Sequence, residues 1–465
     1  MSDTARQAEA ISAPHTRRRA TPLRLLMPLC FVLFPPVLFC TLLFRDVSNI
    51  PFYDDYYAFL DFLNQLIPLH GVAAKLSCFL ASQHNEYKLF LLHGLAWLQF
   101  ATFGHIDFRI DSSIGNGFIL LLGILLWKTF LPNQKDLTTR LTLFIPVSWL
   151  LFQFQNWENL NWAASGLQHL AVLPFSLGAI YLLLRGGRIA FIVASFSLVL
   201  AIGSDGNGFI MVPIGVTILA LARHYRRVAA WLLVSAACVA AYAYGYTVRP
   251  PQVGLAIPVV AHPRLLAPLY ALAFVGSAAS FPFLACSFLL GSLLIVFFML
   301  LARRGYIRKT PFVSWSVLFL LLTAAGVAAL RSRYGVEQAV VSRYTIYSAL
   351  LLIFAWFIIA EEFLQHRPSS LFKNDILLCA VLLSIPWSLS MDFLGWLQLE
   401  RRDHALIMAM RSYEHPNSPA TQTGPSPPLL NLKIASDPVT DDFNRRVRPI
   451  LADSIQQGVY RPPPL

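Results

Sequence analysis

The sequence predicts an all-α polytopic membrane protein, and three observations support this fold class. The 465 residues are 56% hydrophobic and 13% charged, whereas about a quarter of the residues in a soluble globular domain are charged. The mean hydropathy is +0.58. Apolar windows long enough, or nearly so, to cross a hydrocarbon core of roughly 30 Å recur from Leu23 to Leu394. These windows are continuous, whereas the strands of a membrane β-barrel alternate in short segments, so a barrel is excluded.

The basic N-terminus, residues 1–22, precedes the first apolar run. Arg17, Arg18, Arg19 and Arg24 come just before or at the start of this run, as in a signal peptide. The run is too long for a signal peptide and has no small-residue cleavage site. We therefore predict an uncleaved first helix with a cytoplasmic N-terminus.

Thirteen apolar segments follow one another along the chain. They cover residues 23–44, 88–104, 113–131, 141–155, 167–184, 189–203, 208–222, 229–248, 266–281, 283–301, 311–330, 343–362 and 374–394. The net charge of +12 comes from short basic clusters between these runs. Such clusters mark cytoplasmic loops, and this distribution argues against a nucleic-acid partner.

Placing every basic cluster inside fixes the number of crossings between them. The stretches 25–185 and 227–303 must each cross an even number of times, yet each contains one segment too many. We predict that segments 88–104 and 266–281 re-enter or lie along the interface. About 11 spans remain, within a range of 11–13.

The predicted topology puts nearly all polar, non-basic sequence outside. The outer regions are the first outer loop 45–87, residues 156–168, 204–208, 249–265 and 331–343, and the tail 395–465. The tail is predicted to contain a Pro-rich linker and a short helix. A functional face outside the membrane, carried by a bundle over 23–394, explains this asymmetry.

Two adjacent carboxylates, Asp54 and Asp55, lie among tyrosines of the first outer loop. Adjacent residues do not share a helix face, so at most one of them points into a pocket. Like charges split their pKa values, and a low dielectric raises the pKa of the less solvated group toward the range of a general base. The alternative is a solvated acidic turn with an aromatic belt.

A second polar cluster ends the same loop. His84 and Lys88 are four residues apart with Glu86 between them, so a helix here would present an acid and two bases at the membrane surface. Under the alternative interpretation, Lys88 snorkels to the interface and Asn85 caps a helix.

A third cluster surrounds two tryptophans, Trp157 and Trp162. Its polar members are Gln155, Asn156, Glu158, Asn159, Asn161, Gln168 and His169. One charge at the bilayer centre costs about 2.5–3.5 kcal/mol on insertion scales, so this stretch should line a wet cavity. Aromatic faces and amides suit a sugar. A hydrated loop with interfacial tryptophans is the alternative.

A fourth cluster is basic although it lies outside. Arg331, Arg333 and Arg343, the last followed by Tyr344, offer guanidinium groups that suit phosphate oxygens. Anionic lipid head groups are the alternative ligand. The turn with Asp205 and Asn207 gives only a weak indication of a binding role.

Several common catalytic motifs are absent from the sequence. There is no Walker-type phosphate loop, no HExxH and no GxSxG, which removes support for ATP-driven transport and serine hydrolysis. We expect no cofactor. Two acids and a histidine in the first outer loop permit a divalent metal, but no spacing selects one. The cysteine spacing predicts neither a disulfide framework nor a metal site.

The order of the outer motifs resembles the GT-C class of integral-membrane glycosyltransferases. The similarity is closer still to a poorly characterised bacterial multi-pass subgroup. The motifs are FYDDYY, QHNEYK, QNWENLNW with GLQ, SDGNGFIMVP, GYTVRPP and AVVSRYTIYSALL. The chain lacks the large outer domain of better-known GT-C enzymes, since the tail has only about seventy residues.

The resemblance implies a polyprenyl-phosphate-linked sugar donor and an active site between the first outer loop and the membrane. Asp54 or Asp55 would deprotonate the acceptor hydroxyl, with Glu86 as a further catalytic candidate. The sugar would move with inversion, and Arg331, Arg333 or Arg343 would meet the departing phosphate. The other substrate-binding candidates are His84, Asn85, Lys88, Trp157, Glu158, Asn159, Trp162, Gln168, Asp205, Asn207 and Tyr344.

The sequence therefore predicts a glycosyltransferase of a bacterial cytoplasmic membrane, with its active face in the periplasm. Its partners would be the lipid-linked donor, membrane lipids and a glycan or lipid acceptor. The alternative is a transporter or flippase of lipid-linked glycans, in which the outer clusters bind without chemistry. Charges deep inside helices would favour transport, and the sequence has few of them.

Overall fold

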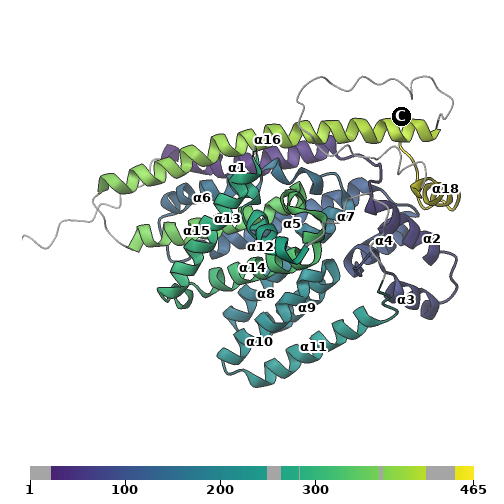
Figure 1. The fold of residues 1–465 in the computed structure, drawn as a ribbon, viewed down its shortest axis with the longest axis horizontal. Helices are drawn as coiled ribbons and strands as arrows, with labels where there is room; N and C mark the ends of the chain where they lie inside the picture. Colours follow the sequence, from purple (N-terminus) through teal and green to yellow (C-terminus); the bar gives the residue numbers. More distant parts are fainter. Residues whose placement is uncertain (1–21, 249–262, 282, 366–369, 415–445, 465) are drawn as a thin grey trace, which may run out of the picture.

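The computed structural model describes residues 22–248, 263–281, 283–365, 370–414 and 446–464. Within these ranges the regular structure is helical, and the only β pairing consists of two isolated bridges. Figure 1 shows the long helices running side by side along the longest axis of the molecule. The predicted fold class, an all-α multi-pass membrane protein, is confirmed at this level.

Eight helices of the described chain are long and apolar enough to cross a membrane. They are Arg24–Asp46, Phe108–Thr129, Ala163–Arg185, Tyr225–Ala243, Leu284–Arg303, Pro311–Tyr334, Ser342–Glu362 and Cys379–Arg411. Six shorter apolar helices accompany them: Val72–Ala81, Phe90–Phe103, Leu137–Leu151, Arg188–Ser204, Gly206–Leu221 and Pro263–Val275. Two of the shorter helices, α4 (Phe90–Phe103) and α12 (Pro263–Val275), occupy the segments predicted not to span.

The helices of the bundle alternate with short turns. Their bounds are α1 Pro22–Asp46, α5 Phe108–Thr129, α6 Leu137–Leu151, α8 Val172–Arg185, α9 Arg188–Ser204, α10 Met211–Leu221, α11 Tyr225–Ala243, α13 Leu284–Arg303, α14 Pro311–Arg331, α15 Thr345–Gln365 and α16 Ser370–Glu414. Local sequence sets several of these limits. Asp136 caps α6 by accepting the Thr139 N–H at 3.0 Å, and Gly186 and Gly187 turn the chain with φ of 74° and 90°.

The centre of the bundle is formed by α15. Of the membrane-length window Ser342–Glu362, 78% is buried, compared with 11% of Tyr225–Ala243 and 17% of Arg24–Asp46. The helices α1 and α11 therefore present most of their apolar surface outward, as lipid-facing helices do. Close backbone contact fixes α16 against the segment after α6, because a Cβ at Gly395 would overlap the Phe154 carbonyl.

The shorter elements gather at one end of the bundle, which we call the loop end (right in Figure 1). It carries α2 (Phe62–Leu66), α3 (Val72–Ala81), α4 and α18 (Arg448–Gln456). The first outer loop thus folds into helices that pack at one end of the long helices. The six-residue π-helix Tyr56–Asp61 begins this folded loop.

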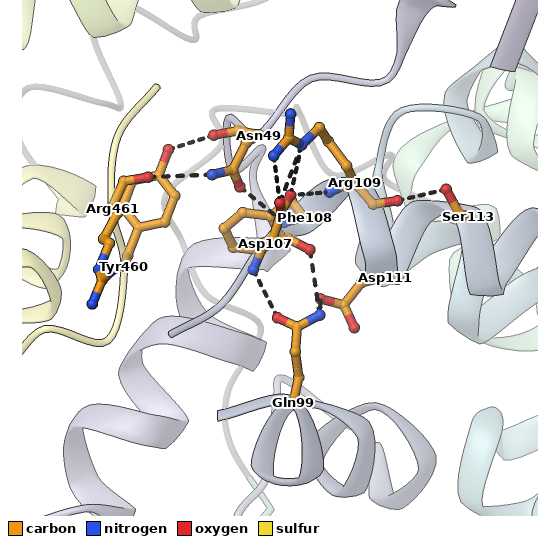
Figure 2. Close-up of polar contacts among 9 residues, drawn as sticks. All are labelled: Asn49, Gln99, Asp107, Phe108, Arg109, Asp111, Ser113, Tyr460 and Arg461. Carbon is orange, nitrogen blue, oxygen red and sulfur yellow. Dashed lines mark hydrogen bonds and ion pairs between the residues drawn. The ribbon is translucent and has the colours of Figure 1, made fainter. Parts of the chain in front are cut away.

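The end of the chain is tied to the first outer loop and to the start of α5. The Ile106 N–H donates to the Val459 carbonyl at 2.8 Å, and the Tyr460 hydroxyl donates to the Asn49 carbonyl at 2.5 Å. Figure 2 shows the Asn49 amide, which also donates to the Arg461 carbonyl at 3.2 Å. These contacts hold Tyr460 in place, and its side chain is almost completely buried.

The tail differs from the predicted boundary at residue 395. The apolar segment predicted at 374–394 is the first part of α16, which continues to Glu414 as one helix of 45 residues. At 1.5 Å per residue this helix is about 68 Å long, so its last turns extend beyond a bilayer core. The predicted Pro-rich linker over 415–438 and the N-terminal arginines at 17–19 lie outside the described residues.

Candidate functional site

The two adjacent carboxylates of the first outer loop have different surroundings. Tyr53 precedes them with a φ of 40°, a left-handed conformation that turns the chain sharply. Asp55 is only 1% exposed. Its Oδ2 accepts the Phe52 N–H at 3.0 Å and its Oδ1 accepts the Ala164 N–H at 2.8 Å. Asp55 therefore ties the loop to the start of the α8 region, and backbone donors engage both of its oxygens.

Asp54 faces a histidine from the other end of the loop. Its Oδ1 lies 2.9 Å from Nε2 of His84, and its side chain is 36% exposed. Burial alone raises the pKa of Asp54, but His84, Arg343 and Arg331 together outweigh it and leave the pKa below its usual range. Asp54 is thus an ionised, accessible carboxylate near two guanidinium groups.

The pKa values of the two carboxyl groups agree with the sequence-based expectation in one respect and differ from it in another. Burial raises the pKa of Asp55 well above its usual range, against the opposing effect of the Phe52 and Ala164 N–H groups. The less solvated carboxyl therefore has the raised pKa, as expected, but its oxygens are occupied. The accessible carboxyl, Asp54, has a lowered pKa because the cations around it favour its charged form.

The segment predicted as a helix at Ser82–Lys88 is instead a tight turn. His84 and Tyr87 exchange backbone hydrogen bonds of 2.9 and 2.8 Å, and Asn85 has a φ of 49°. Lys88 is fully buried, and its ammonium donates to the carbonyls of Leu80 and Tyr244. The turn brings His84 to Asp54 and leaves Lys88 as a link between α3 and α11, outside the cluster. The Asn85 amide nitrogen lies 2.9 Å from the His84 Nε2.

Each predicted arginine contacts a different partner, and two of these partners, Glu86 and Glu158, are themselves predicted site residues. Arg331 donates to the Tyr87 hydroxyl at 3.3 Å. Arg333 lies 3.4 Å from Glu86, with side-chain exposures of 33% and 46%. Of these three arginines, Arg343 has the closest carboxylate contact, at 3.3 Å from Glu158. The three arginines, together with Asp54, His84, Glu86, Tyr87 and Glu158, are called the charge cluster below.

Aromatic rings line the charge cluster. The Arg343 guanidinium lies 5.5 Å from the ring centre of Trp162 and 5.3 Å from that of Tyr344. Trp162 in turn packs edge-on against Phe52, with 5.1 Å between ring centres. Because Phe52 is two residues before Asp54, these rings connect the first outer loop with the chain segments that carry Trp162 and Arg343.

Arg402 of α16 belongs to this neighbourhood, although the sequence analysis did not select it. It is 6% exposed, and its guanidinium lies 4.3 Å from the ring centres of both Phe52 and Trp157. It donates to the Asn161 side-chain oxygen at 3.0 Å and lies 3.9 Å from Glu158. A guanidinium held between two rings and a carboxylate fixes three segments in place.

The remaining predicted residues lie near the cluster with different roles. The Asn159 amide donates to the Arg343 carbonyl at 3.2 Å, and its side-chain oxygen accepts the Ser165 hydroxyl at 2.6 Å. Asn207 donates to the Tyr347 hydroxyl at 3.2 Å. Gln168 lies in the π-helix Gly166–Leu170, and its half-buried side chain makes no hydrogen bond within the described part of the chain. Asn159 therefore helps to hold the backbone of Arg343 in place.

Several buried polar atoms in this region have no hydrogen-bond partner among the described residues. Both side-chain polar atoms of Asn156, the Trp162 Nε1, the Asn207 Oδ1 and the Arg333 Nε are buried without a hydrogen bond among the described residues. Polar groups of this kind are satisfied by water or by a ligand. Together with the arginines, they suit a ligand that has hydroxyl groups and an anionic centre.

Metal binding receives no support from the described residues, in which no group of three or more His, Cys, Asp or Glu side chains could hold an ion. The arrangement instead offers one ionised carboxylate next to a histidine, three guanidinium groups and several aromatic faces. It can bind an anion and accept a proton from a hydroxyl group.

Comparison of the chain with protein-family models, with curated proteins and with solved structures gave no match. The chemistry of the charge cluster is therefore argued from its own residues.

Proposed function

We propose that the protein is an inverting membrane glycosyltransferase of the GT-C type, which uses a polyprenyl-phosphate-linked sugar as donor. The observation that carries this proposal is the position of Asp54. It is an ionised, half-exposed carboxylate 2.9 Å from His84 and within the electrostatic reach of Arg331 and Arg343. A base and a phosphate-binding group are the two functions that this reaction requires from a protein.

In the proposed reaction, Asp54 accepts the proton of the acceptor hydroxyl. The acceptor oxygen attacks the anomeric carbon while the bond from this carbon to the phosphate oxygen breaks. The electron pair goes to the phosphate, whose growing charge the guanidinium groups of Arg331 and Arg343 stabilise. Attack from the face opposite the leaving phosphate inverts the anomeric carbon.

The arginines can exchange their present partners for a phosphate. The Arg333–Glu86 pair is partly exposed, and exposed ion pairs contribute about 0–1 kcal/mol, so a phosphate competes with Glu86 at little cost. Arg343 is held more firmly, because its side chain and its backbone N–H both contact Glu158, at 3.3 and 3.0 Å. Glu158 therefore orients Arg343, and Arg333 is the adaptable member.

The lengths of two helices support the proposal that segments 88–104 and 266–281 do not span the membrane. The helices α4 and α12 have 14 and 13 residues, which correspond to about 21 and 20 Å. A hydrocarbon core of roughly 30 Å needs about 20 residues, so neither helix crosses it alone. The stretches 25–185 and 227–303 then each cross the membrane an even number of times. In this topology the loop end and the charge cluster face the periplasm of a bacterial cytoplasmic membrane.

A direct test uses the purified protein in liposomes with a panel of polyprenyl-phosphate sugars and soluble or lipid acceptors. The proposal predicts release of polyprenyl phosphate together with a glycosylated acceptor of inverted anomeric configuration. Movement of intact lipid-linked glycan between leaflets, without release of phosphate, would instead support the flippase alternative.

The role of the arginines has its own test. Arg343→Gln should raise the donor KM about 10–100-fold, because one charge-assisted contact to phosphate is lost. Arg333→Gln should raise it less, since Arg333 is the exposed and adaptable partner. Arg264→Gln, a change in an arginine of α12 outside the charge cluster, is the matched control. An unchanged donor KM in Arg343→Gln would remove that residue from the donor site.

A further inference from the structure

A second histidine–carboxylate pair lies next to the charge cluster and has no part in the reaction as described so far. The Nδ1 of His169 lies 3.2 Å from Oδ2 of Asp205, and each residue is 8% exposed. His169 belongs to the π-helical turn Gly166–Leu170 before α8, and Asp205 follows the last residue of α9. Two separate elements therefore build the pair.

Aromatic contacts connect this pair to Arg343. The rings of His169 and Tyr344 meet edge-on with 5.5 Å between centres, and the Arg343 guanidinium lies 5.3 Å from the same Tyr344 ring. His169 and Arg343 thus both contact Tyr344. In the described part of the chain, Asp205 and Tyr344 are the titratable side chains that contact His169.

A second connection runs through Tyr87. Burial raises the pKa of Tyr87 to about 12; the Asp205 carboxylate adds to this rise and Arg331 opposes it. Arg331 also donates to the Tyr87 hydroxyl at 3.3 Å. A Cβ built at Gly206 would lie 3.4 Å from the Tyr87 ring, so the chain next to Asp205 packs on this ring. The His169–Asp205 pair is therefore connected to Arg343 through the Tyr344 ring and to Arg331 through Tyr87.

The orientation of the His169 ring leaves one nitrogen for chemistry. Asp205 engages Nδ1, which favours the proton on that nitrogen and fixes the ring. The other nitrogen, Nε2, makes no hydrogen bond among the described residues and is not among the buried polar atoms that lack a partner. A histidine held in this way by a carboxylate is the usual arrangement of a general acid or base.

We propose that His169, oriented by Asp205, is the proton donor to the phosphate that leaves with the lipid; this inference rests on the proposed glycosyl transfer. When the bond from the anomeric carbon to the phosphate oxygen breaks, its electron pair stays on that oxygen, and the Nε2 proton of the His169 imidazolium moves to it. Asp54 gains the proton of the acceptor hydroxyl in the same turnover. Proton exchange with water then restores both groups, so that overall one proton passes from acceptor to phosphate.

The two histidine–aspartate pairs thus divide the work of the site. Asp54 has a side chain that is 36% exposed, so an acceptor from the aqueous phase can reach it, whereas His84 beside it is buried. His169 and Asp205 are both buried, among helices whose apolar surfaces suit a lipid-linked donor. The two aspartates therefore differ in exposure, at 36% for the Asp54 side chain and 11% for that of Asp205, as separate acceptor and donor sides require.

The test compares pH–rate profiles of transfer for the wild-type protein, His169→Gln and Asp205→Asn, measured in liposomes with a polyprenyl-phosphate sugar. A general acid in the reaction should make the wild-type rate fall on the alkaline side. His169→Gln should lower kcat about 100-fold or more and abolish this alkaline fall, with little change in donor KM. Asp205→Asn keeps a hydrogen-bond acceptor but removes the carboxylate that orients the ring, so its kcat should fall less than that of His169→Gln, with little change in donor KM.

The control is His70→Gln, since His70 is an exposed histidine in the turn before α3, away from both pairs. Its profile should match the wild type. Thermal unfolding of each variant shows whether it is folded. If His169→Gln retains the wild-type kcat and alkaline fall while the wild type transfers sugar, the donor role of His169 is overturned and glycosyl transfer stands. If the wild type releases no polyprenyl phosphate from any donor, both proposals are overturned.

Discussion

Asp54 and His84 face each other across the first outer loop, with 2.9 Å between Oδ1 and Nε2. The contact closes the loop on itself, because Asp54 follows the sharp turn at Tyr53 and His84 begins the tight turn that ends at Tyr87. The charges of Arg331 and Arg343 reach the same carboxylate. One accessible acid is thereby set among cations.

Replacement of His84 should change the acid side of the activity profile. His84 lowers the pKa of Asp54, so in His84→Gln this pKa should rise. Asp54 would then become protonated at a higher pH during acidification, and the rate should begin to fall at a higher pH than in the wild type. Profiles of transfer rate against pH measure this shift; identical acid sides would contradict the contact.

Asp55→Asn should affect stability more than chemistry. An amide places an NH₂ group against either the Phe52 or the Ala164 N–H, so one buried backbone donor loses its acceptor. Such a loss costs about 1–3 kcal/mol. Thermal unfolding in detergent should show a lower midpoint, with residual transfer in the folded fraction. Gln65→Ala, a change in a side chain that bonds only the partly exposed Asp61 nearby, is the control that should unfold as the wild type does.

Arg402 should act as a positioning residue that joins α16 to the first outer loop. In Arg402→Met the two cation–π contacts to Phe52 and Trp157 are lost, and each is worth about 2 kcal/mol when desolvated. We expect lower thermal stability and a lower kcat, with Arg402→Lys intermediate because it keeps the charge without the planar group. Arg411→Met on the exposed side of the same helix is the control; equal effects at both positions would contradict the assignment.

The end of the chain should stabilise the first outer loop. Tyr460→Phe removes one hydrogen bond to the Asn49 carbonyl and should cost about 1 kcal/mol. Limited proteolysis should then cut the region 45–87 faster than in the wild type. Arg461→Ala is the matched control, because Arg461 accepts the Asn49 amide through its backbone carbonyl (Figure 2). Proteolysis at the same rate in Tyr460→Phe and wild type would show that this contact is dispensable.

The sequence predicts the fold class well because a hydrocarbon core imposes its thickness on every spanning helix. It also predicts that Asp54 and Asp55 have different roles, since adjacent residues point apart. It does not indicate which of them is accessible. That choice depends on the left-handed turn at Tyr53 and on the Ala164 N–H, a donor from a segment far along the chain.

Two further features of the site depend on contacts between distant segments. Lys88 leaves the cluster because the backbone reverses between His84 and Tyr87, whereas the four-residue spacing from His84 to Lys88 predicts a helix. Arg402 lies next to the charge cluster because α16 continues past the predicted end of its apolar segment and packs on Trp157. The only signal for Arg402 in the sequence is a pair of arginines directly after an apolar run.

The most direct measurement of the central claim is the release of polyprenyl phosphate in liposomes by wild type, Asp54→Asn and Asp61→Asn. Asp61 ends the same π-helix that follows Asp55 and lies outside the charge cluster, so its variant controls for the loss of a carboxylate from this loop. With Asp54 as the base, Asp54→Asn should remain folded and lose about 10²–10⁴-fold in kcat, while Asp61→Asn retains the wild-type rate. Wild-type release by folded Asp54→Asn would contradict the account.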